Sequence, residues 1–495
     1  MIDLNSLNQY RENNRIEAKK AIKGLPHSIW ETYSAFANTL GGIILLGVEE
    51  LPDGTLHAIG LPDPDKLIRE FWDIINNPNK ANVNILTNRH VRIEDVDGLR
   101  IIVIEVPRAQ RYYKPVFVNG NPVSGTYRRN GEGDYHCTDD ELHAMYRDAS
   151  IKTQDMLVLD GLDASVFCQA SIKGYRQRML LSRPNHVWEP LDDEDFLMKV
   201  GAMGIGEDGR IHPTAAGLLM FGYEYEIVRE YPQYFLDYRE IYDDTHRWTD
   251  RIISSSGDWS GNLFDFYYRV YNRIQQDIKI PFELKSGHRV DDTPIHKAIR
   301  EALANCLINA DYYGRQGLVI TKERGLITMS NPGDFRIDID AAKSGGVSDP
   351  RNGTLMKMFN LIDVGERAGS GIPSIFGVWK QQGWDDPVIT QTFEPNRILL
   401  SLPFQGGFGN ALSSKSGDKK VAIKSGDKKV ATKANAHKDA IIAYLEDHGT
   451  AKNSELCDLL DLKSSRVRVL LKSLIDDGIV ISENGNKNRI YRLKS

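Results

Sequence analysis

The stretch "IHKAIREALANCLINADYY" (295–313) carries the clearest structural signal in this chain. Its apolar residues recur at helical spacing, at positions 295, 298, 299, 302, 303, 306, 307 and 310. Lys297, Glu301, Asn305 and Asn309 stand four residues apart, so they share one face of the predicted helix. Asparagine is unfavourable inside a helix, which indicates another reason for its presence here. An exposed polar edge remains the alternative interpretation.

Two downstream segments strengthen a functional interpretation of that helix. The stretch "GLITMSNPGDF" (325–335) predicts a strand that ends in a Pro-Gly turn, and "LIDVGERAGSGIPSIF" (361–376) predicts a glycine-containing loop that runs into a helix. Glycines before a helix N-terminus let backbone N–H groups approach phosphate oxygens. A lone Gly-x-Gly is weak evidence, but the ordered combination of helix, strand and loop is more specific.

These segments resemble the divergent GHKL-type (Bergerat) ATP-binding domain of bacterial Schlafen AlbA-2 proteins, over residues 270–405. The resemblance implies ATP and Mg²⁺ as cofactors, with Glu301 polarising the attacking water and Asn305 helping to hold the metal ion. A carboxylate can accept the proton of water, and an amide oxygen suits a hard cation. The usual Asp-x-Gly-x-Gly box is replaced by "NPGDF". The further cofactor-binding candidates are Asn331, Gly333, Asp334, Gly365, Gly369, Ser370 and Gly371.

The N-terminal region mixes predicted strands and helices and is expected to form an α+β domain. Three of its stretches, "ENNRIEAKK" (12–20), "AFANTLGGIILLGVEE" (35–50) and "GTYRRNGEGDYHCTDDEL" (125–142), resemble the Schlafen AlbA-2 domain. The last of them contains a capping box, Thr138-x-x-Glu141, that predicts a helix start.

The nuclease members of the Schlafen group imply a candidate cutting site in this domain. Mapped onto this chain, the acids are Glu12, Glu17 and Glu49, with Glu50 as an alternative to Glu49, and they would hold Mg²⁺ or Mn²⁺. The basic residues expected to hold a nucleic-acid backbone are Lys19, Lys20, Arg128 and Arg129. Taken alone, Glu12 and Glu17 fit an ordinary polar surface equally well, and binding without cutting is the alternative.

The C-terminal part begins with a flexible linker. The stretch "KSGDKKVAIKSGDKKVATK" (415–433) writes a nine-residue unit twice and has almost nothing to bury. After it, residues 437–495 predict three helices and two strands around an Asn-Gly turn, which is the winged helix-turn-helix pattern. The third helix buries Val467, Leu470, Leu471 and Leu474. Its candidate DNA contacts are Arg466, Arg468 and Lys472.

The sequence therefore predicts an α+β and α/β multidomain protein. The expected order is an AlbA-2 domain (1–148), a helical bridge (149–269), a GHKL-like α/β sandwich (270–405), a basic linker (406–436) and a winged helix (437–495). Residues 411–495 hold 17 basic and 11 acidic residues, a net charge of +6, whereas the whole chain of 495 residues carries −6. A basic tail on an acidic body suggests an anionic partner such as nucleic acid, with a solvated linker as the alternative.

Several properties bound the setting of the protein. Its apolar runs are too short to span a bilayer, and its start lacks the features of a secretory signal. Four scattered cysteines without a C-x-x-C motif favour a reducing cytoplasm. GHKL domains often dimerise with nucleotide, so the resemblance implies a homo-oligomer.

Two functions from different classes remain. The first is an ATP-responsive nucleic-acid-acting effector, with the AlbA-2 domain as a candidate metal-dependent nuclease and defence or stress response as its setting. The second is a non-catalytic, nucleotide-sensing transcriptional regulator that binds DNA. A helicase is excluded because the sequence holds no Walker A pattern.

Overall fold

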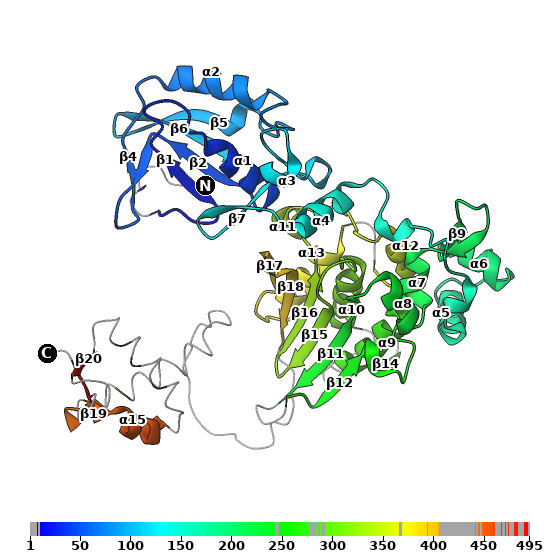
Figure 1. Ribbon diagram of the computed structural model, residues 1–495. Coiled ribbons are helices and arrows are strands. Elements are labelled where there is room, and N and C mark those ends of the chain that lie inside the picture. Colours follow the sequence, from blue (N-terminus) through cyan, green and yellow to red (C-terminus); the bar gives the residue numbers. More distant parts are fainter. Residues whose placement is uncertain are drawn as a thin grey trace. The chain divides into compact units, whose positions relative to one another are not determined.

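The computed structural model describes most of the chain, in two units. The described residues are 7, 10–242, 247–276, 284–285, 288–289, 293–365, 369–393 and 395–404, followed by 441, 444–445, 448–460, 467, 471, 474, 480–483 and 490–493. The first unit spans Met1–Asn410 and the second Ala411–Ser495. The mixed α+β multidomain fold expected from the sequence is confirmed (Figure 1).

The N-terminal part of the first unit is built on a four-stranded sheet of order β1-β2-β6-β5. Strand β1 runs parallel to β2, while β2 with β6 and β6 with β5 are antiparallel. The bounds are β1 (Ile16–Lys19), β2 (Gly42–Leu46), β5 (Val91–Val96) and β6 (Leu99–Val106), with helices α1 (Ile29–Asn38) and α2 (Pro64–Ile75).

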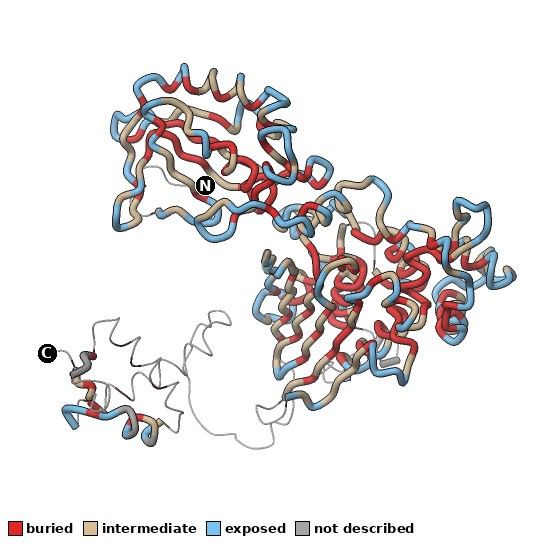
Figure 2. Tube along the Cα trace, in the orientation of Figure 1, coloured by how far each residue is buried: buried red, intermediate tan, exposed pale blue. Residues whose placement is uncertain are grey.

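Both faces of this sheet are covered, as the alternation of its side chains requires. Ile44 belongs to the core that includes α1 and α2, whereas its neighbour Leu45 belongs to a smaller cluster with Leu7 and Val48. Trp30 of α1 stacks on Phe71 of α2, with 5.4 Å between the ring centroids. Figure 2 shows β2 and β6 buried over most of their length.

Helix α1 ends in the stretch "NTLGG", and Asn38 fixes that end to the rest of the domain. Its side-chain amide donates to the carbonyls of Val116 (2.8 Å) and Tyr127 (3.0 Å), and its Oδ1 accepts the N–H of Val116 (2.9 Å). Gly41 has a φ of +73°, and a Cβ there would lie 2.8 Å from the carbonyl oxygen of Val106. The stretch "NTLGG" therefore packs the end of α1 closely against the sheet.

Smaller elements complete this region. They are the hairpin of β3 (Val48–Glu50) and β4 (Leu56–Ala58), the short helix α3 (Pro122–Gly125), the hairpin of β7 (Tyr127–Asn130) and β8 (Gly133–His136), and helix α4 (Asp139–Ala149). Thr138 and Glu141 form the predicted capping box, because the Thr138 N–H donates to the Glu141 carboxylate at 2.7 Å and the Thr138 side chain accepts the Glu141 N–H.

A six-stranded sheet forms the second body of this unit, in the order β12-β11-β15-β16-β18-β17. Strand β11 pairs parallel with β15, and the other neighbours are antiparallel. The bounds are β11 (Leu236–Ile241), β12 (Asp250–Ile253), β15 (Leu318–Glu323), β16 (Leu326–Pro332), β17 (Val388–Phe393) and β18 (Asn396–Pro403).

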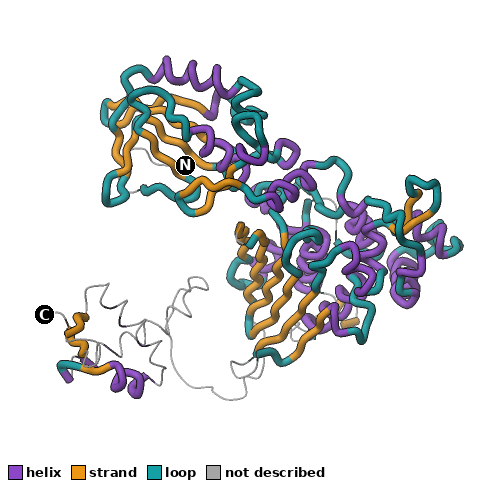
Figure 3. Tube along the Cα trace, in the orientation of Figure 1, coloured by secondary structure: helices purple, strands orange, loops and turns teal. Residues whose placement is uncertain are grey.

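Helices gather along this sheet (Figure 3). Helix α10 (Pro294–Ile308) packs between α9 (Leu263–Gln275) and α13 (Gly371–Gln381), and it contacts β16. The apolar stripe predicted for 295–310 is buried in the core of this body. The helix, the strand and the second helix predicted for these segments are present as α10, β16 and α13.

The predicted bridge of residues 149–269 differs from the structure. Its last part supplies β11, β12 and most of α9, so it belongs to the six-stranded sheet and its helical layer. The sheet therefore begins before residue 270. The alternating apolar pattern of β11 is weak because Asp237 and Glu240 are buried in ion pairs with Arg251 and Lys322 respectively.

The other α-helices and strands of the first unit are α5 (Gln169–Ser182), α6 (Asp193–Val200), β9 (Met203–Ile205), β10 (Ile211–Pro213), α7 (Ala215–Phe221), α8 (Glu224–Glu230), β13 (Leu284–Lys285), β14 (His288–Arg289), α11 (Ile339–Ser344) and α12 (Gly353–Leu361).

The second unit has its own small core. Helix α15 (Asn453–Leu460) lies with a three-stranded sheet of order β19-β21-β20, formed by β19 (Ala451–Lys452), β20 (Val480–Glu483) and β21 (Ile490–Leu493). Val467, Leu471 and Leu474 are buried, as the sequence predicted for the third helix. Strands β20 and β21 are the two predicted strands of the wing.

Candidate functional site

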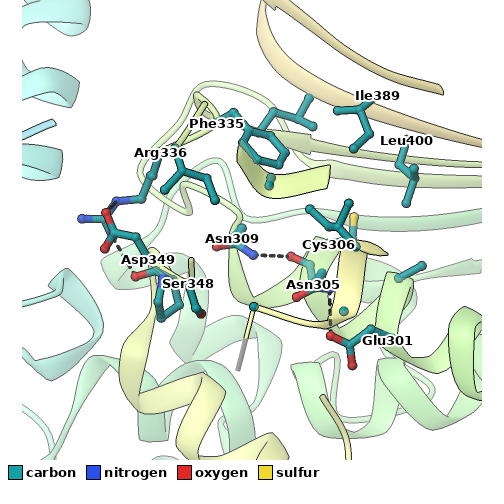
Figure 4. Close-up of a pocket in the computed structure, with 18 of the residues that line it drawn as sticks. Glu301, Asn305, Cys306, Asn309, Phe335, Arg336, Ser348, Asp349, Ile389 and Leu400 are labelled. Atoms are coloured by element: carbon teal, nitrogen blue, oxygen red, sulfur yellow. Dashed lines mark hydrogen bonds and ion pairs between the residues drawn. The ribbon is translucent and has the colours of Figure 1, made fainter. Parts of the chain in front are cut away.

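A cavity lies between α10, the end of β16, the residues before α12 and the start of α13 (Figure 4). It encloses about 1040 Å³ of empty space, its open mouth included. Six of the residues predicted to bind the nucleotide line it, namely Glu301, Asn305, Asn331, Asp334, Gly369 and Gly371. The structure thus brings together residues that lie up to 70 positions apart in the sequence.

The polar face of α10 forms one side of the cavity. The Asn305 side-chain amide donates to the Glu301 carboxylate at 3.1 Å, and the Asn309 amide donates to the backbone carbonyl of Asn305 at 3.0 Å. Asn309 is the C-cap of α10, so it lies at the helix end. These hydrogen bonds explain why two asparagines are found in and at the end of the helix despite their low helix propensity. They also place the Glu301 carboxylate beside the Asn305 amide.

The glycine-containing loop packs against Glu301. A Cβ on Gly371 would lie 2.0 Å from Glu301 Oε1, so a larger residue there would displace the Glu301 carboxylate. Gly365 and Gly369 have φ values of +74° and +67°, in the region that glycine favours. Ser370 is the N-cap position of α13, so the first N–H groups of that helix lie beside Glu301.

The end of β16 forms another part of the wall. Asn331 is buried, and its amide contacts the carbonyls of Asn309 and Pro332 at 3.4 Å each. Gly333 has a φ of +101° and lies outside this cavity, in the lining of a second one. Asp334 lines both cavities, and its buried Oδ1 has no hydrogen-bond partner. A buried carboxylate oxygen in that state is an acceptor for a ligand donor or for water.

Apolar side chains line the remaining part of the cavity. Phe335, Ile389 and Leu400 lie together, away from Glu301 (Figure 4). Cys306 also lines the wall, and burial raises the pKa of its thiol to about 12, so it stays a thiol at neutral pH. The cavity therefore has an apolar region and a polar region.

Sequence reasoning missed Arg336 and Asp349. Among the described lining residues, Arg336 is the one cation, against the carboxylates of Glu301, Asp334 and Asp349. Arg336 Nε lies 3.8 Å from the Asp349 carboxylate, and burial lowers the pKa of the guanidinium. The position of Arg336 two residues after Asp334 was the available signal, since a buried strand end followed by two opposite charges seldom lies in open solvent.

The three N-terminal glutamates lie on different elements, with Glu12 before β1, Glu17 on β1 and Glu49 on β3, and each is bonded to another group. Glu12 accepts the Ala18 N–H at 2.9 Å, and burial together with the Glu17 charge raises its pKa. Glu17 pairs with Lys19 at 2.7 Å and with Arg129 at 2.8 Å. Glu49 pairs with Lys20 at 2.6 Å. Within the part of the chain that the structure describes, no group of three or more His, Cys, Asp or Glu residues is arranged to hold a metal ion.

The basic residues predicted to hold nucleic acid differ strongly in exposure. Arg129 is almost fully buried, with 1% of its side chain exposed, and pairs with Glu17 and Asp134. Arg128 pairs with Glu141 and donates to the carbonyl of Phe393. Lys19 is also largely buried, whereas Lys20 exposes 64% of its side chain. Arg129 and Arg128 thus form intramolecular ion pairs and hydrogen bonds in this structure.

The predicted DNA contacts of the winged helix, Arg466, Arg468 and Lys472, lie outside the described residues. None of the helices in the described part of the chain is long and apolar enough to span a membrane.

Four family models match parts of this chain. Residues 12–138 match "Schlafen, AlbA_2", residues 321–400 match "Putative ATP-dependent DNA helicase recG C-terminal", and residues 438–481 match "Winged helix-turn-helix DNA-binding". Residues 143–237 match a domain of unknown function. The chain carries the three predicted domain types. The Schlafen AlbA_2 and winged-helix domains make nucleic acid the partner class.

Two solved structures are similar to this chain. One is the crystal structure of the DIP2311 protein from Corynebacterium diphtheriae, 15% identical, with 97% of this chain and 92% of that chain covered and a TM-score of 0.40. The other is the solution structure of the N-terminal domain of a RecG-related protein from Nitrosomonas europaea, 35% identical. It covers 27% of this chain and 90% of that one, with a TM-score of 0.22. No curated protein matches this chain.

Proposed function

We propose that this chain is an ATP-responsive nucleic-acid-binding protein whose N-terminal domain binds nucleic acid without cutting it. The observation that carries the nucleotide assignment is the cavity at α10, where a Glu-Asn pair faces a glycine-led helix N-terminus and an unpartnered buried carboxylate oxygen lies in the wall. Nucleic acid as partner follows from the domain composition.

The lining residues fit a nucleotide with a divalent cation. Asp334 Oδ1 offers an acceptor for an exocyclic amino group next to the apolar side chains of the wall. Three carboxylates against one guanidinium repel a bare triphosphate, so a cation is needed to offset the charge. Asn305 would supply an oxygen ligand to Mg²⁺, which neutralises phosphate charge when bound.

Glu301 is the residue of this chain suited to proton transfer. The Asn305 amide fixes its carboxylate by a 3.1 Å hydrogen bond, and the start of α13 packs against it. In the proposed site it orients a water molecule and accepts its proton, while the N–H groups at the start of α13 face the phosphate oxygens. The adjoining residues 366–368 lie outside the described range.

The N-terminal charges favour binding over cutting. Glu17 and Glu49 are each neutralised by a basic residue at 2.8 Å or less, which leaves no free set of three acids for a metal ion among the described residues. The winged helix supplies the expected contacts with phosphates. The expected homo-oligomer remains part of this proposal.

One experiment separates this function from a nuclease. Purified protein is incubated with tRNA, single-stranded RNA and duplex DNA, with Mg²⁺ or Mn²⁺ and with or without ATP, beside Glu17→Ala and Glu301→Ala. We expect binding without cleavage, ATP binding that requires Mg²⁺, and loss of ATP hydrolysis in Glu301→Ala. Metal-dependent cleavage that Glu17→Ala abolishes would refute the binding-only role. Nucleotide binding that is unchanged in Asn305→Ala and independent of Mg²⁺ would refute the ATP site.

A further inference from the structure

The wall of the nucleotide-type cavity is shared with a second cavity. Asp334, Phe335 and Arg336 line both. The second cavity is lined both by residues of the N-terminal region, among them Arg108 and Arg111, and by further residues of the second body, such as Asp311 and Arg351. A segment three residues long thus separates the proposed nucleotide from the Schlafen AlbA_2 domain.

Arg108 holds this segment from the N-terminal side. It follows β6 by two residues, and its guanidinium donates to the carbonyl of Phe335 and, at 3.1 Å, to Gln391 of the edge strand β17. Burial lowers the pKa of Arg108, and the Asp334 carboxylate is the largest of the charges that oppose this. Phe335 and Asp334 therefore keep their places partly through a residue that lies more than 220 positions away.

Arg111 holds the neighbouring piece of the wall. Its Nε donates to the Asp349 carboxylate at 2.6 Å, and its Nη1 donates to the carbonyls of Asp148 (2.6 Å) and Ser150 (2.8 Å). Asp349 lines the nucleotide-type cavity and faces Arg336 at 3.8 Å. The Arg111 side chain is 9% exposed and that of Asp349 is 22% exposed, so the ion pair is partly shielded from solvent.

Both contacts run from the N-terminal domain to the wall of the cavity. Each arginine belongs to the N-terminal domain and donates to an atom of the cavity wall, Arg108 to the Phe335 carbonyl and Arg111 to the Asp349 carboxylate. Arg351 also donates to the Asp334 carbonyl at 2.8 Å, so the wall is held from both sides. Loss of one of these contacts leaves a buried polar or charged group that must find another partner, which shifts the wall. Ligand affinity then depends on the domain that supplies the bonds.

We propose that Arg108 and Arg111 are positioning residues of the nucleotide site, supplied by the nucleic-acid-binding domain. This rests on the proposed ATP binding. Nucleotide in the cavity and nucleic acid on the N-terminal domain are then coupled, and the coupling acts equally in both directions. The Arg108 contact with Phe335 and the Arg111 pair with Asp349 carry it.

The test compares full-length variants with a matched control. Arg108→Gln and Arg111→Gln each remove one contact to the wall, whereas Arg100→Gln removes an exposed ion pair with Asp65 (2.9 Å) on the same domain. Isothermal titration gives the dissociation constant for MgATP, and fluorescence anisotropy gives the affinity for duplex DNA and tRNA with and without MgATP. Circular dichroism and thermal unfolding report folding.

We expect Arg108→Gln and Arg111→Gln to weaken MgATP binding by about tenfold, as for loss of a hydrogen bond to a charged group. In these variants the ratio of the nucleic-acid dissociation constants with and without MgATP should be close to one. Their nucleic-acid affinity in the absence of nucleotide should equal that of the wild type. Arg100→Gln should change neither. If Arg111→Gln unfolds, Arg111→Lys and Asp349→Asn decide: the first keeps the ion pair and should lose less affinity than the second.

Two outcomes would overturn this inference and they are distinct. If the wild type binds MgATP and both glutamine variants bind it equally well with the coupling unchanged, Arg108 and Arg111 have no positioning role. If the wild type binds no MgATP, the proposed function fails and this inference fails with it.

Discussion

Gly371 offers the sharpest test of the proposed site. Replacing it by alanine places a Cβ 2.0 Å from Glu301 Oε1, whereas ordinary contact begins at 3.4 Å. The carboxylate must therefore move by roughly 1.4 Å, since it is the flexible end of a side chain while Gly371 is fixed in the helix backbone. That displacement breaks its hydrogen bond with Asn305.

The cost to stability is small, and the cost to function is large. Losing a hydrogen bond to a charged group costs about 2 kcal/mol, and alanine in place of glycine in a helix returns about 0.5 to 1 kcal/mol. The net loss of about 1 kcal/mol lowers the melting temperature by only a few degrees. A reacting group misplaced by about 1 Å, however, costs on the order of 10- to 100-fold in rate.

The assay is steady-state ATP hydrolysis with Mg²⁺, beside thermal unfolding. Gly377 of the same helix is the matched control, because a Cβ there meets nothing within 4 Å. We expect Gly371→Ala to lose at least tenfold in hydrolysis and Gly377→Ala to keep wild-type hydrolysis with equal or higher stability. Equal hydrolysis in wild type, Gly371→Ala and Gly377→Ala would show that Glu301 is not the reacting group.

Three further predictions concern buried polar groups of the N-terminal domain. Asn38→Ala leaves the backbone groups that bond its side chain without partners, so it should lower the free energy of unfolding in urea by about 3 kcal/mol or more. The exposed control Asn79→Ala should change that free energy by less than about 0.5 kcal/mol. Equal changes in the two variants would contradict this. Arg129→Met strips two carboxylates of their shared cation and should cost about 3 to 5 kcal/mol, whereas exposed Lys20→Met should cost little; a folded Arg129→Met variant with unchanged stability and weakened RNA binding would instead make Arg129 a nucleic-acid ligand. Burial lowers the pKa of Lys114 from 10.5 to about 7, so the unfolded chain binds the extra proton between these values and stability from this group rises with pH across that window. Lys114→Met removes that rise, so the wild type should gain about 2 kcal/mol of stability relative to the variant between about pH 7 and about pH 9; a constant difference would show an ordinary amine.

The polar face of α10 could be read from the sequence because helical spacing fixes it locally. Glu301, Asn305 and Asn309 lie where a period of four residues places them, and the glycines at 369 and 371 lie where a loop must enter a helix. These features need no knowledge of the rest of the chain. The close approach of Gly371 to Glu301 was not predicted from the sequence and became visible only in the fold.

The N-terminal charges could not be assigned in this way. Glu17 and Arg129 are separated by 112 positions and meet at 2.8 Å, so a residue proposed as a phosphate contact is the buried partner of a residue proposed as a metal ligand. A basic residue has the same sequence pattern whether its side chain faces solvent or pairs with a buried carboxylate. Only its burial distinguishes the two cases.

The sequence by itself determined the helix α10, the capping box at the start of α4, and which residues stack along α10. Those features follow from local spacing and from composition, which act over a few residues. The tertiary structure decided that β11 and β12 complete the six-stranded sheet, that Glu17 is neutralised, and that Arg108 and Arg111 reach the cavity wall. Charge pairing and burial depend on residues distant in the chain, so no local pattern could have fixed them.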